Sequence, residues 1–245
     1  MKTVLFLDFD GTLAPLADAP HKAFMPARVR DLLRKLSRDR NFKIVIISGR
    51  DIKDLREKVG LKNIIYAGSH GLEIKGPGIN LNIAKSSAST RVLRGILAGL
   101  RKALFGIKGV LIENKGLSVA FHYRLVSGAD KKRAVSVFKN LVEPFRRASK
   151  IKILPGKKVF EVCLPVNWDK GRAALYIILK LFHGETILPI YVGDDVTDEK
   201  AFKALRGAAL TIHVGEKHDT AAEFGVKDTR GVYRLIANLA AQRGG

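Results

Sequence analysis

Short apolar runs alternate with amphipathic segments in the first and last parts of the chain. In the first part, the pattern predicts strands and helices in turn over 3–8, 26–38, 43–48, 51–58 and 63–68. The alternation resumes later, and predicts further helices and strands over 170–182, 189–194, the residues after Thr197, 208–214 and 232–241. Short apolar strands separated by helices are typical of a parallel sheet with helices on its faces. We therefore predict an α/β fold with a Rossmann-like parallel-sheet core.

The middle of the chain breaks this alternation. There, the pattern predicts a helix and two strands, then the same three elements again, over 87–105, 110–113, 117–123, 130–145, 151–154 and 159–164. Two successive helix-strand-strand units favour a separate small sheet with helices on one face, an α+β module. We therefore predict a core domain made of residues 1–84 and 168–245, interrupted by an inserted domain over residues 85–167.

The charge of the chain is strongly positive, at +21 over 245 residues. Residues 85–167 hold 18 Lys and Arg against 4 Asp and Glu, a net charge of +14, so the predicted insertion carries most of the excess. A basic segment attracts a phosphorylated metabolite as readily as RNA, and solvated helix faces explain the same residues equally well. Aromatic residues make up only 7% of the chain and offer few platforms for stacked bases, so a nucleic-acid-binding module is the weaker alternative.

The apolar runs and the cysteine content bear on the compartment. No apolar run approaches the roughly 20 residues that a membrane span requires, and no secretory pattern follows Lys2. The single cysteine, Cys163, cannot form an internal disulfide, and we expect it to be buried and inert. These features predict a cytoplasmic chain without a membrane partner, and we expect a monomer.

Two carboxylates follow the first predicted strand, in the segment DFDGTL. Ligands of an open α/β sheet bind beyond the carboxyl ends of its strands, which is where Asp8 and Asp10 fall. Gly11 permits a sharp turn, and we expect the hydroxyl of Thr12 to bond back to the loop. One acid at a strand end is a common structural feature, whereas two acids before Gly-Thr point to a reactive site.

Two further polar residues end or begin predicted core elements. Ser48, in IISGR, follows a strand and can offer its hydroxyl to a phosphate oxygen, although capping explains such a serine as well. Lys170, in WDKGRA, lies in the first turn of a helix that Asp169 caps. A positive charge at the start of a helix interacts unfavourably with the helix dipole, and a functional role would explain this loss of stability. The alternative is an ordinary surface lysine.

Four acids crowd the segment YVGDDVTDE after another predicted strand: Asp194, Asp195, Asp198 and Glu199. Acids this close repel one another unless a cation neutralises them, and capping of a helix explains only one or two. A hard cation with oxygen ligands suits them, and Mg²⁺ typically combines one or two carboxylates with phosphate oxygens. We therefore predict that Asp8 and Asp194 share Mg²⁺ with a phosphoryl group.

The order of these motifs along the whole chain resembles the haloacid dehalogenase superfamily of phosphatases. The resemblance implies that Asp8 attacks phosphorus, that Asp10 serves as general acid and base, and that Ser48 and Lys170 hold the phosphoryl oxygens. It also implies Mg²⁺ held by Asp8, the backbone carbonyl of Asp10 and Asp194, with Asp195 and Asp198 supporting the metal site. The insertion resembles the larger cap domain of one branch of the superfamily, which sets substrate specificity.

A closer resemblance, to trehalose-6-phosphate phosphatases, rests on five motifs: GSHGLE, ENKGLSVAFHYR, GKKVFEV, WDKGRA and GDDVTDEKAF. In that family the GKxxxE residues contact sugar hydroxyls, which implies this role for Lys157 and Glu161. The resemblance extends the candidate substrate-binding set to Arg50, His70, Glu113, Ser118, His122 and Arg124. The family usually continues the GKxxxE strand with Arg-Pro, where this chain has Cys163, Leu164 and Pro165.

The resemblance implies a magnesium-dependent phosphatase that hydrolyses trehalose 6-phosphate through an aspartyl-phosphate. Another sugar phosphate, such as a sucrose or mannosylglycerate phosphate, would leave the core residues unchanged and alter only the inserted domain. Some of the inserted-domain candidates also have ordinary structural explanations. His122 beside Tyr123 fits a half-buried pair, while Glu113 and Glu161 fit the solvent face of a strand.

Overall fold

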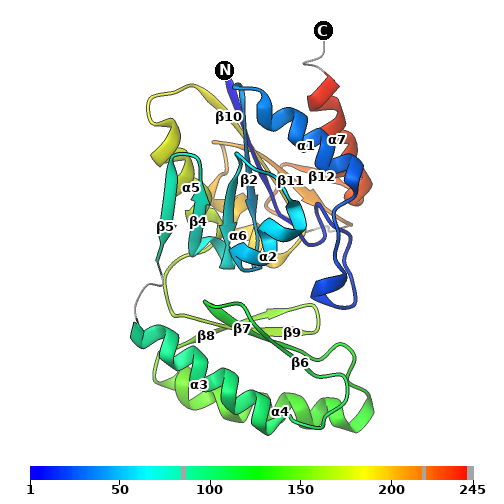
Figure 1. Ribbon diagram of the computed structural model, residues 1–245, viewed down its shortest axis with the longest axis vertical. Coiled ribbons are helices and arrows are strands. Elements are labelled where there is room, and N and C mark those ends of the chain that lie inside the picture. The colour runs from blue at the N-terminus through cyan, green and yellow to red at the C-terminus, as the bar shows by residue number, and fades with distance from the viewer. Residues whose placement is uncertain (84–86, 217–218, 242–245) are drawn as a thin grey trace. The chain divides into compact units, whose positions relative to one another are not determined.

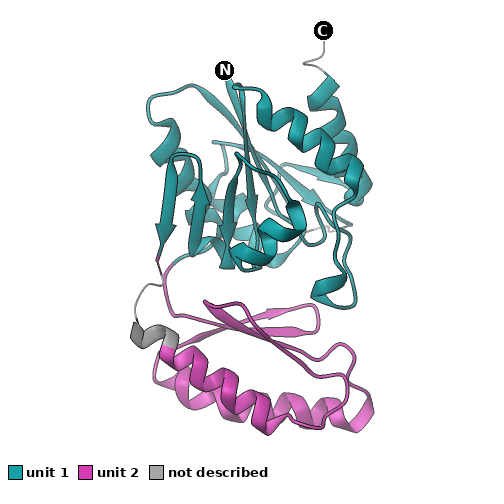
Figure 2. Cartoon of the chain, in the orientation of Figure 1, with its two compact units in different colours: residues 1–82, 168–245 teal, residues 83–167 magenta. Residues whose placement is uncertain are grey.

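A computed structural model describes residues 1–83, 87–216 and 219–241 (Figure 1). The chain divides into two compact units, unit 1 formed by residues 1–82 and 168–245 and unit 2 by residues 83–167 (Figure 2). The boundary that the sequence predicts, between Ala84 and Lys85, lies outside the described residues. Among the described helices, none combines the length and the apolar character needed to cross a bilayer.

Unit 1 contains an eight-stranded sheet in the order β12-β11-β10-β1-β2-β3-β4-β5. Its strands, in chain order, are β1 (Lys2–Leu7), β2 (Phe42–Ile47), β3 (Ile65–Gly68), β4 (Glu73–Gly76), β5 (Ile79–Asn82), β10 (Ile187–Gly193), β11 (Leu210–Val214) and β12 (Phe224–Val226). The strands from β12 to β3 run parallel, which confirms the predicted α/β fold. The sequence analysis missed β12 and the antiparallel β4 and β5, because strands of three or four residues carry too little periodicity.

Helices cover both faces of this sheet (Figure 1). They are α1 (Ala27–Arg38), α2 (Ile52–Val59), α5 (Lys170–Phe182), α6 (Val196–Ala204) and α7 (Thr229–Ala241), with short 3₁₀ turns η1 (Pro20–Lys22) and η2 (Ser69–Gly71). Alternate residues of β1 face opposite sides: Leu5 and Leu7 join the buried cluster with α1, α2 and α7, and Val4 and Phe6 join the one with α5 and α6. The result is a three-layer unit with an apolar core on each side of the sheet.

Unit 2 consists of a four-stranded antiparallel sheet and two helices. The elements are α3 (Ser87–Ala103), β6 (Leu111–Asn114), β7 (Ser118–His122), α4 (Gly128–Arg147), β8 (Lys152–Gly156) and β9 (Val159–Cys163), with strand order β6-β7-β9-β8. Val119, Phe121 and Val162 pack with Leu100 of α3 and Phe138 of α4. One face of the sheet is therefore covered by both helices, as the sequence predicts.

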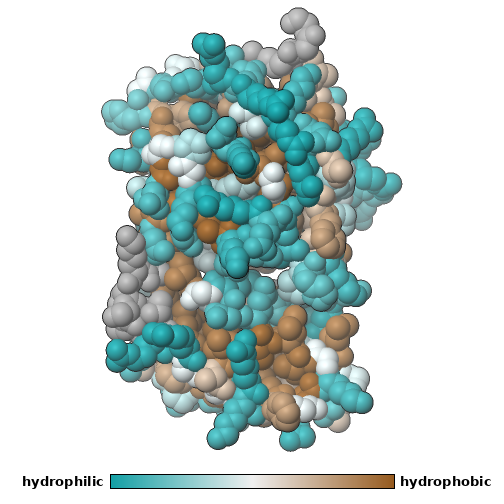
Figure 3. All heavy atoms as spheres, viewed as in Figure 1, coloured by the Kyte–Doolittle hydropathy of each residue, from teal (hydrophilic) through white to brown (hydrophobic). Residues whose placement is uncertain are grey.

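The basic residues of unit 2 are largely exposed. The exposed cations on its helices include Arg101, Lys102, Lys132, Arg133, Lys139, Arg146 and Arg147. In the space-filling view, hydrophilic groups of unit 2 stand among hydrophobic ones (Figure 3). Phe105 and Leu125 are exposed hydrophobic residues of this unit. The positive charge therefore belongs mainly to solvated helix faces.

The topology of unit 1 places the motifs side by side. β1 pairs in parallel with β10 on one side and with β2 on the other, so the carboxyl ends of all three strands lie at one edge of the sheet. These strands lead directly into Asp8, Asp194 and Ser48. Three motifs far apart in sequence therefore meet at one edge.

Candidate active site

Asp8 and Lys170 form a buried ion pair at the centre of this edge. The Lys170 Nζ donates to Asp8 Oδ1 at 2.7 Å and to Asp198 Oδ1 at 2.8 Å. The side chains of all three residues are 6% exposed or less. Lys170 is the first residue of α5, and Asp169 caps that helix by accepting from the Arg172 amide, as the sequence predicts. Two carboxylates therefore offset the cost of a lysine at a helix start.

Three acids converge close enough to share a cation. Oxygen atoms of Asp8, Asp194 and Asp198 all lie within 4.8 Å of one another. Gly11 has a φ of +86°, and a Cβ on it would lie 2.2 Å from Asp194 Oδ2, so only glycine lets the DxDGT loop pass this carboxylate. The donor set is entirely carboxylate oxygen, which is the chemistry that Mg²⁺ prefers.

Burial and the neighbouring charges shift the pKa values of Asp8 and Lys170. Burial is the main cause that raises the pKa of Asp8, and repulsion from Asp198 and Asp194 adds to it against the attraction of Lys170. Burial lowers the pKa of Lys170, but attraction from Asp198 and Asp8 outweighs it and raises that pKa overall. A divalent cation among the three acids would favour the charged form of Asp8.

Backbone hydrogen bonds shape the loop after β1. The amides of Leu13 and Ala14 donate to the carbonyl of Phe9 at 3.0 and 2.8 Å, and the Gly11 amide donates to the carbonyl of Ala14. The hydroxyl of Thr12 is buried and has no hydrogen-bond partner among the described residues. The expectation that Thr12 bonds back to the loop is therefore wrong, because backbone groups already close the turn.

Asp10 points to Arg50 rather than into the acid cluster. The Arg50 guanidinium donates from Nε to Asp10 Oδ2 at 2.6 Å and from Nη2 to Asp10 Oδ1 at 2.7 Å. It also donates to Asp54 on α2. The sequence analysis places Arg50 among the substrate-binding candidates, whereas the structure commits its side chain to intramolecular ion pairs.

Ser48 and His70 lie in adjoining turns. The Ser48 Oγ accepts from the Arg50 amide at 3.2 Å, and the His70 amide donates to the Ser48 carbonyl at 2.9 Å. Ser69 and His70 both have positive φ values, of 50° and 58°, which are uncommon for residues with a side chain. A Cβ on Gly49 would lie 2.8 Å from the His70 ring, so the motifs IISGR and GSHGLE pack directly against each other.

The remaining acids of YVGDDVTDE have structural partners. Asp195 caps α6 through its side chain, which accepts from the Val196 amide, and Asp198 completes the capping box by accepting from the Asp195 amide. Glu199 accepts from Thr220 and from the Ala221 amide. Asp195 does not belong to the three-acid group, and its support of the metal stays a prediction.

The candidate residues of unit 2 gather on the face of its sheet away from the helices. Glu113 pairs in register with Ala120, and Ala120 with Glu161, so alternation along the strands puts Glu113, Ser118, His122 and Glu161 on one face. Glu161 Oε1 accepts from Ser118 at 2.5 Å, and His122 Nε2 lies 2.9 Å from Glu113 Oε2.

The GKxxxE strand also contacts a residue that follows β7. Arg124 donates from Nη2 to the carbonyl of Lys157 at 3.0 Å. Glu161 is 8% exposed, so the alternative of an ordinary solvent-facing residue does not hold for it.

Two further residues contact the candidate residues and lie inside the motifs YVGDDVTDE and ENKGLSVAFHYR, but the sequence pattern does not single them out. The Tyr191 hydroxyl donates to Asp198 Oδ1 at 2.8 Å, and Lys115 lies 3.4 Å from Glu161 Oε2. Burial lowers the pKa of Lys115, but the charges of Glu161 and Glu113 raise it overall. A tyrosine in a core strand and a lysine in a turn are both common in folded proteins. Only the contacts with Asp198 and Glu161 connect these two residues with the candidate site.

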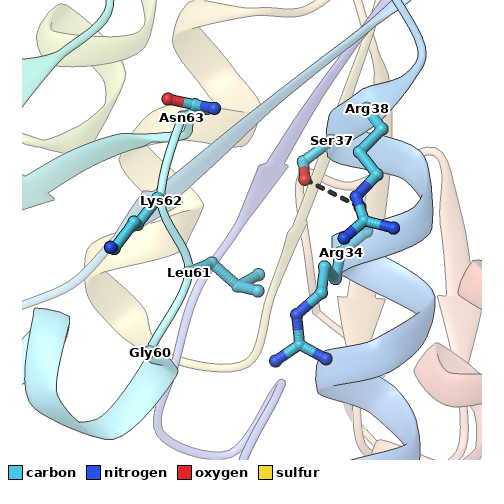
Figure 4. A pocket seen from close by; sticks show the side chains of 7 residues that line it. All are labelled: Arg34, Ser37, Arg38, Gly60, Leu61, Lys62 and Asn63. Atoms are coloured by element: carbon cyan, nitrogen blue, oxygen red, sulfur yellow. Dashed lines mark hydrogen bonds between the residues drawn. The ribbon is translucent and has the colours of Figure 1, made fainter.

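A basic pocket of about 610 Å³ in unit 1 lies apart from these carboxylates (Figure 4). Its lining residues are Arg34, Ser37, Arg38, Gly60, Leu61, Lys62 and Asn63. They come from the end of α1 and the turn after α2, which lead into the amino ends of β2 and β3. Cations near helix C-termini stabilise the helix dipole, and Arg34 also pairs with Asp31. We therefore treat this pocket as separate from the candidate site.

Comparison with known proteins places the chain in one family. The family model described as Trehalose-phosphatase matches residues 6–237. A probable trehalose-phosphate phosphatase 4 of Oryza sativa subsp. japonica is 33% identical over 97% of this chain and 66% of the relative. A trehalose-phosphate phosphatase of Mycobacterium ulcerans is 34% identical over 98% of this chain and 62% of the relative. The chain thus spans somewhat less than two thirds of these relatives.

Solved structures agree in fold. A trehalose-6-phosphate phosphatase related protein superposes with a TM-score of 0.81 at 27% identity, covering 98% of both chains. A haloacid dehalogenase-like hydrolase from Bacteroides thetaiotaomicron superposes with a TM-score of 0.67 at 17% identity, covering 98% of this chain and 100% of that one, a likeness of fold alone. From the matched family model and the relatives in sequence, the chain belongs to the trehalose-phosphatase family.

Proposed function

We propose that this protein is a magnesium-dependent phosphatase that hydrolyses trehalose 6-phosphate to trehalose and phosphate. The observation that carries the proposal is the meeting of Asp8, Lys170, Asp194 and Asp198 at the carboxyl edge of the sheet. This arrangement pairs an attacking carboxylate with a cation and with a further site for a divalent metal. Membership of the trehalose-phosphatase family supports the choice of substrate.

The chemistry proceeds in two steps. Asp8 attacks phosphorus, the bond between phosphorus and the sugar oxygen breaks, and Asp10 gives its proton to the departing oxygen. Asp10 then takes a proton from water, whose oxygen attacks the phosphorus of the aspartyl-phosphate, so phosphate leaves and Asp8 is restored. Ser48 and Lys170 hold phosphoryl oxygens through both steps.

The residues present fit Mg²⁺. Asp8, Asp194 and the backbone carbonyl of Asp10 would hold it, Asp198 would orient the site through Lys170 and Tyr191, and Asp195 through its cap. The metal would supply positive charge that stabilises the transferring phosphoryl group. The buried Thr12 hydroxyl, which has no partner among the described residues, also suits an anionic ligand at this loop.

Unit 2 would select the sugar. Its polar sheet face carries Glu113, Ser118, His122 and Glu161, and Arg124 and Lys157 contact each other nearby. Side chains that donate and accept hydrogen bonds suit sugar hydroxyls, and His70 stays a candidate in unit 1. This chain has Cys163 and Leu164 where the family usually has Arg-Pro. Because of this difference, a different sugar phosphate is the second candidate substrate.

The test is phosphate release from a panel of trehalose, sucrose and mannosylglycerate phosphates, with Mg²⁺ and with chelator. We expect turnover of trehalose 6-phosphate that chelator abolishes. Asp8→Asn should lower kcat by at least about 10⁴-fold in a variant that still unfolds in one cooperative thermal transition, because an amide cannot form the covalent intermediate. Preference for another sugar would reassign the substrate, and substantial turnover by a folded Asp8→Asn variant would exclude the covalent route.

A lone cysteine supports a cytoplasmic protein, and we propose a monomer whose ligand is a small sugar phosphate. Salt-dependent retention on RNA together with a lack of phosphatase activity in Mg²⁺ would instead favour a nucleic-acid-binding protein.

A further inference from the structure

Arg50 fixes the direction of the Asp10 carboxyl group. Its Nε and Nη2 bond separate oxygens of Asp10, at 2.6 and 2.7 Å, in a two-bond fork. Such a fork constrains orientation as well as distance, which a single point charge does not. The Arg50 side chain is 5% exposed and that of Asp10 is 36% exposed. The buried cation therefore anchors a carboxylate whose free side faces outward.

Arg50 is itself held by three other groups. Nη1 donates to Asp54 Oδ2 at 2.6 Å, Nη2 also donates to the Pro20 carbonyl at 2.8 Å, and the guanidinium lies 5.2 Å from the centre of the Phe9 ring. These hydrogen bonds and the two to Asp10 engage four of the five N–H donors of the group. Binding of a sugar phosphate through two guanidinium donors would therefore require at least one of these hydrogen bonds to break.

We infer that Arg50 is the positioning residue for Asp10, holding its carboxyl group where the proton transfers of the sugar oxygen and of water take place. The inference rests on the proposed function, in which Asp10 performs those transfers. It replaces direct substrate binding as the role of Arg50. Arg50 is in turn held by Asp54 on α2 and by the Pro20 carbonyl before α1. These two segments therefore fix Asp10 through Arg50.

The test compares two leaving groups in the first chemical step. A sugar alkoxide needs a proton as its bond to phosphorus breaks, whereas 4-nitrophenolate leaves readily without one. Release of each leaving group is measured in a single turnover, so that the shared hydrolysis of the aspartyl-phosphate does not enter. The variants are Arg50→Met, which removes the fork, and Arg50→Lys, which keeps the charge and loses the second bond.

We expect Arg50→Met to slow release of trehalose by about 10²-fold and release of 4-nitrophenol by less than about 5-fold, with a smaller difference of the same sense for Arg50→Lys. If Arg50→Met does not fold, Arg50→Lys decides alone. Arg56→Met is the matched control, because Arg56 lies on the same helix as Asp54 but stacks on Tyr66, and it should leave both rates unchanged.

Two outcomes would overturn the inference: equal losses on both substrates in a folded variant, or a higher KM for the sugar phosphate with unchanged single-turnover rates at saturation. Asp10→Asn separates this inference from the function beneath it. If Asp10→Asn discriminates between leaving groups and the Arg50 variants do not, only the role of Arg50 fails. If Asp10→Asn does not discriminate, the proposed acid role of Asp10 fails first.

Discussion

Lys170 is a fully buried cation whose position depends on the carboxylates around it. Removal of one partner from a buried ion pair costs more than the pair itself contributes, because the remaining charges lose their compensation. Here the remaining charges would be Asp8 and Asp198, with Asp194 close by. The stability of unit 1 and the binding of a cation are therefore coupled at this residue.

Lys170→Met should lower the free energy of unfolding in chelator by about 3–5 kcal/mol, because it leaves repelling acids without a cation. Mg²⁺ should restore part of that loss by binding the folded acids, and activity should remain lost. Chemical denaturation with and without Mg²⁺ measures both effects. Lys180→Met, an exposed lysine on the same helix, is the control and should change stability little.

Cys163 offers a second test at this scale, since it is the only cysteine in the chain. Burial, and to a lesser extent the charge of Glu161, raises the pKa of its thiol. The thiolate is the form that reacts, so iodoacetamide at pH 8.5 should modify the folded protein far more slowly than the protein unfolded in urea. Mass spectrometry of both samples measures the rates, and equal rates would show that the thiol is accessible.

At the scale of elements, the start of α6 combines a structural cap with the acid cluster. Asp195 and Asp198 form a capping box, and Asp198 also accepts from Lys170 and Tyr191. Asp195 and Asp198 thus have different roles although they are only three residues apart. Asp195 holds the helix terminus, and Asp198 connects that terminus to the proposed nucleophile.

Asp195→Ala should therefore cost about 1 kcal/mol of stability, and Asp195→Ser should retain most of it, because serine caps nearly as well. Mg²⁺ typically needs only one or two carboxylates, so Asp195 need not be a ligand. If Asp195 acts only through the cap, the Asp195→Ser variant should reach half-maximal activity at a Mg²⁺ concentration within about threefold of that for the unsubstituted protein. A rise of tenfold or more in the folded serine variant would instead indicate that Asp195 serves the metal directly.

At the scale of the whole molecule, the two units have separate cores. The buried cluster of unit 2 draws on α3, α4, the small sheet and residues next to them, and the Phe138 ring stacks on those of Phe121 and Phe160. A core of this kind can support an independent domain, although one of this length is only marginally stable.

Residues 83–167 expressed alone should fold, with a circular dichroism spectrum of mixed helix and sheet and one cooperative thermal transition. Phe121→Ala in the same fragment should abolish the transition, because truncation of a buried ring costs about 3–5 kcal/mol. A gradual, non-cooperative melt of the original fragment would mean that unit 2 depends on the rest of the chain.

Local patterns predicted much of this protein. The short apolar runs predicted strands where β1, β2 and β10 lie. The polar residues that follow these runs, Asp8, Ser48 and Asp194, were predicted to be site residues. The capping of α5 by Asp169 was also predictable, because a cap involves neighbours in sequence. The short strands β4, β5 and β12, at or next to the edges of the sheet, were missed, since they are specified by pairing with a sheet that already exists.

Residue type and local spacing were enough to predict the order of the helices and of the longer strands, and the polar residues at the strand ends. The partners of those polar residues depend on the folded chain: Asp10 with Arg50, Lys170 with Asp8 and Asp198, and Tyr191 with Asp198. Asp10 and Arg50 are 40 residues apart, and Asp8 and Lys170 are 162 apart. These two pairs form only after parallel strands have brought their carboxyl ends to one edge of the sheet. Burial there strengthens the interactions between the charges, so the stability of each charged group depends on its neighbours.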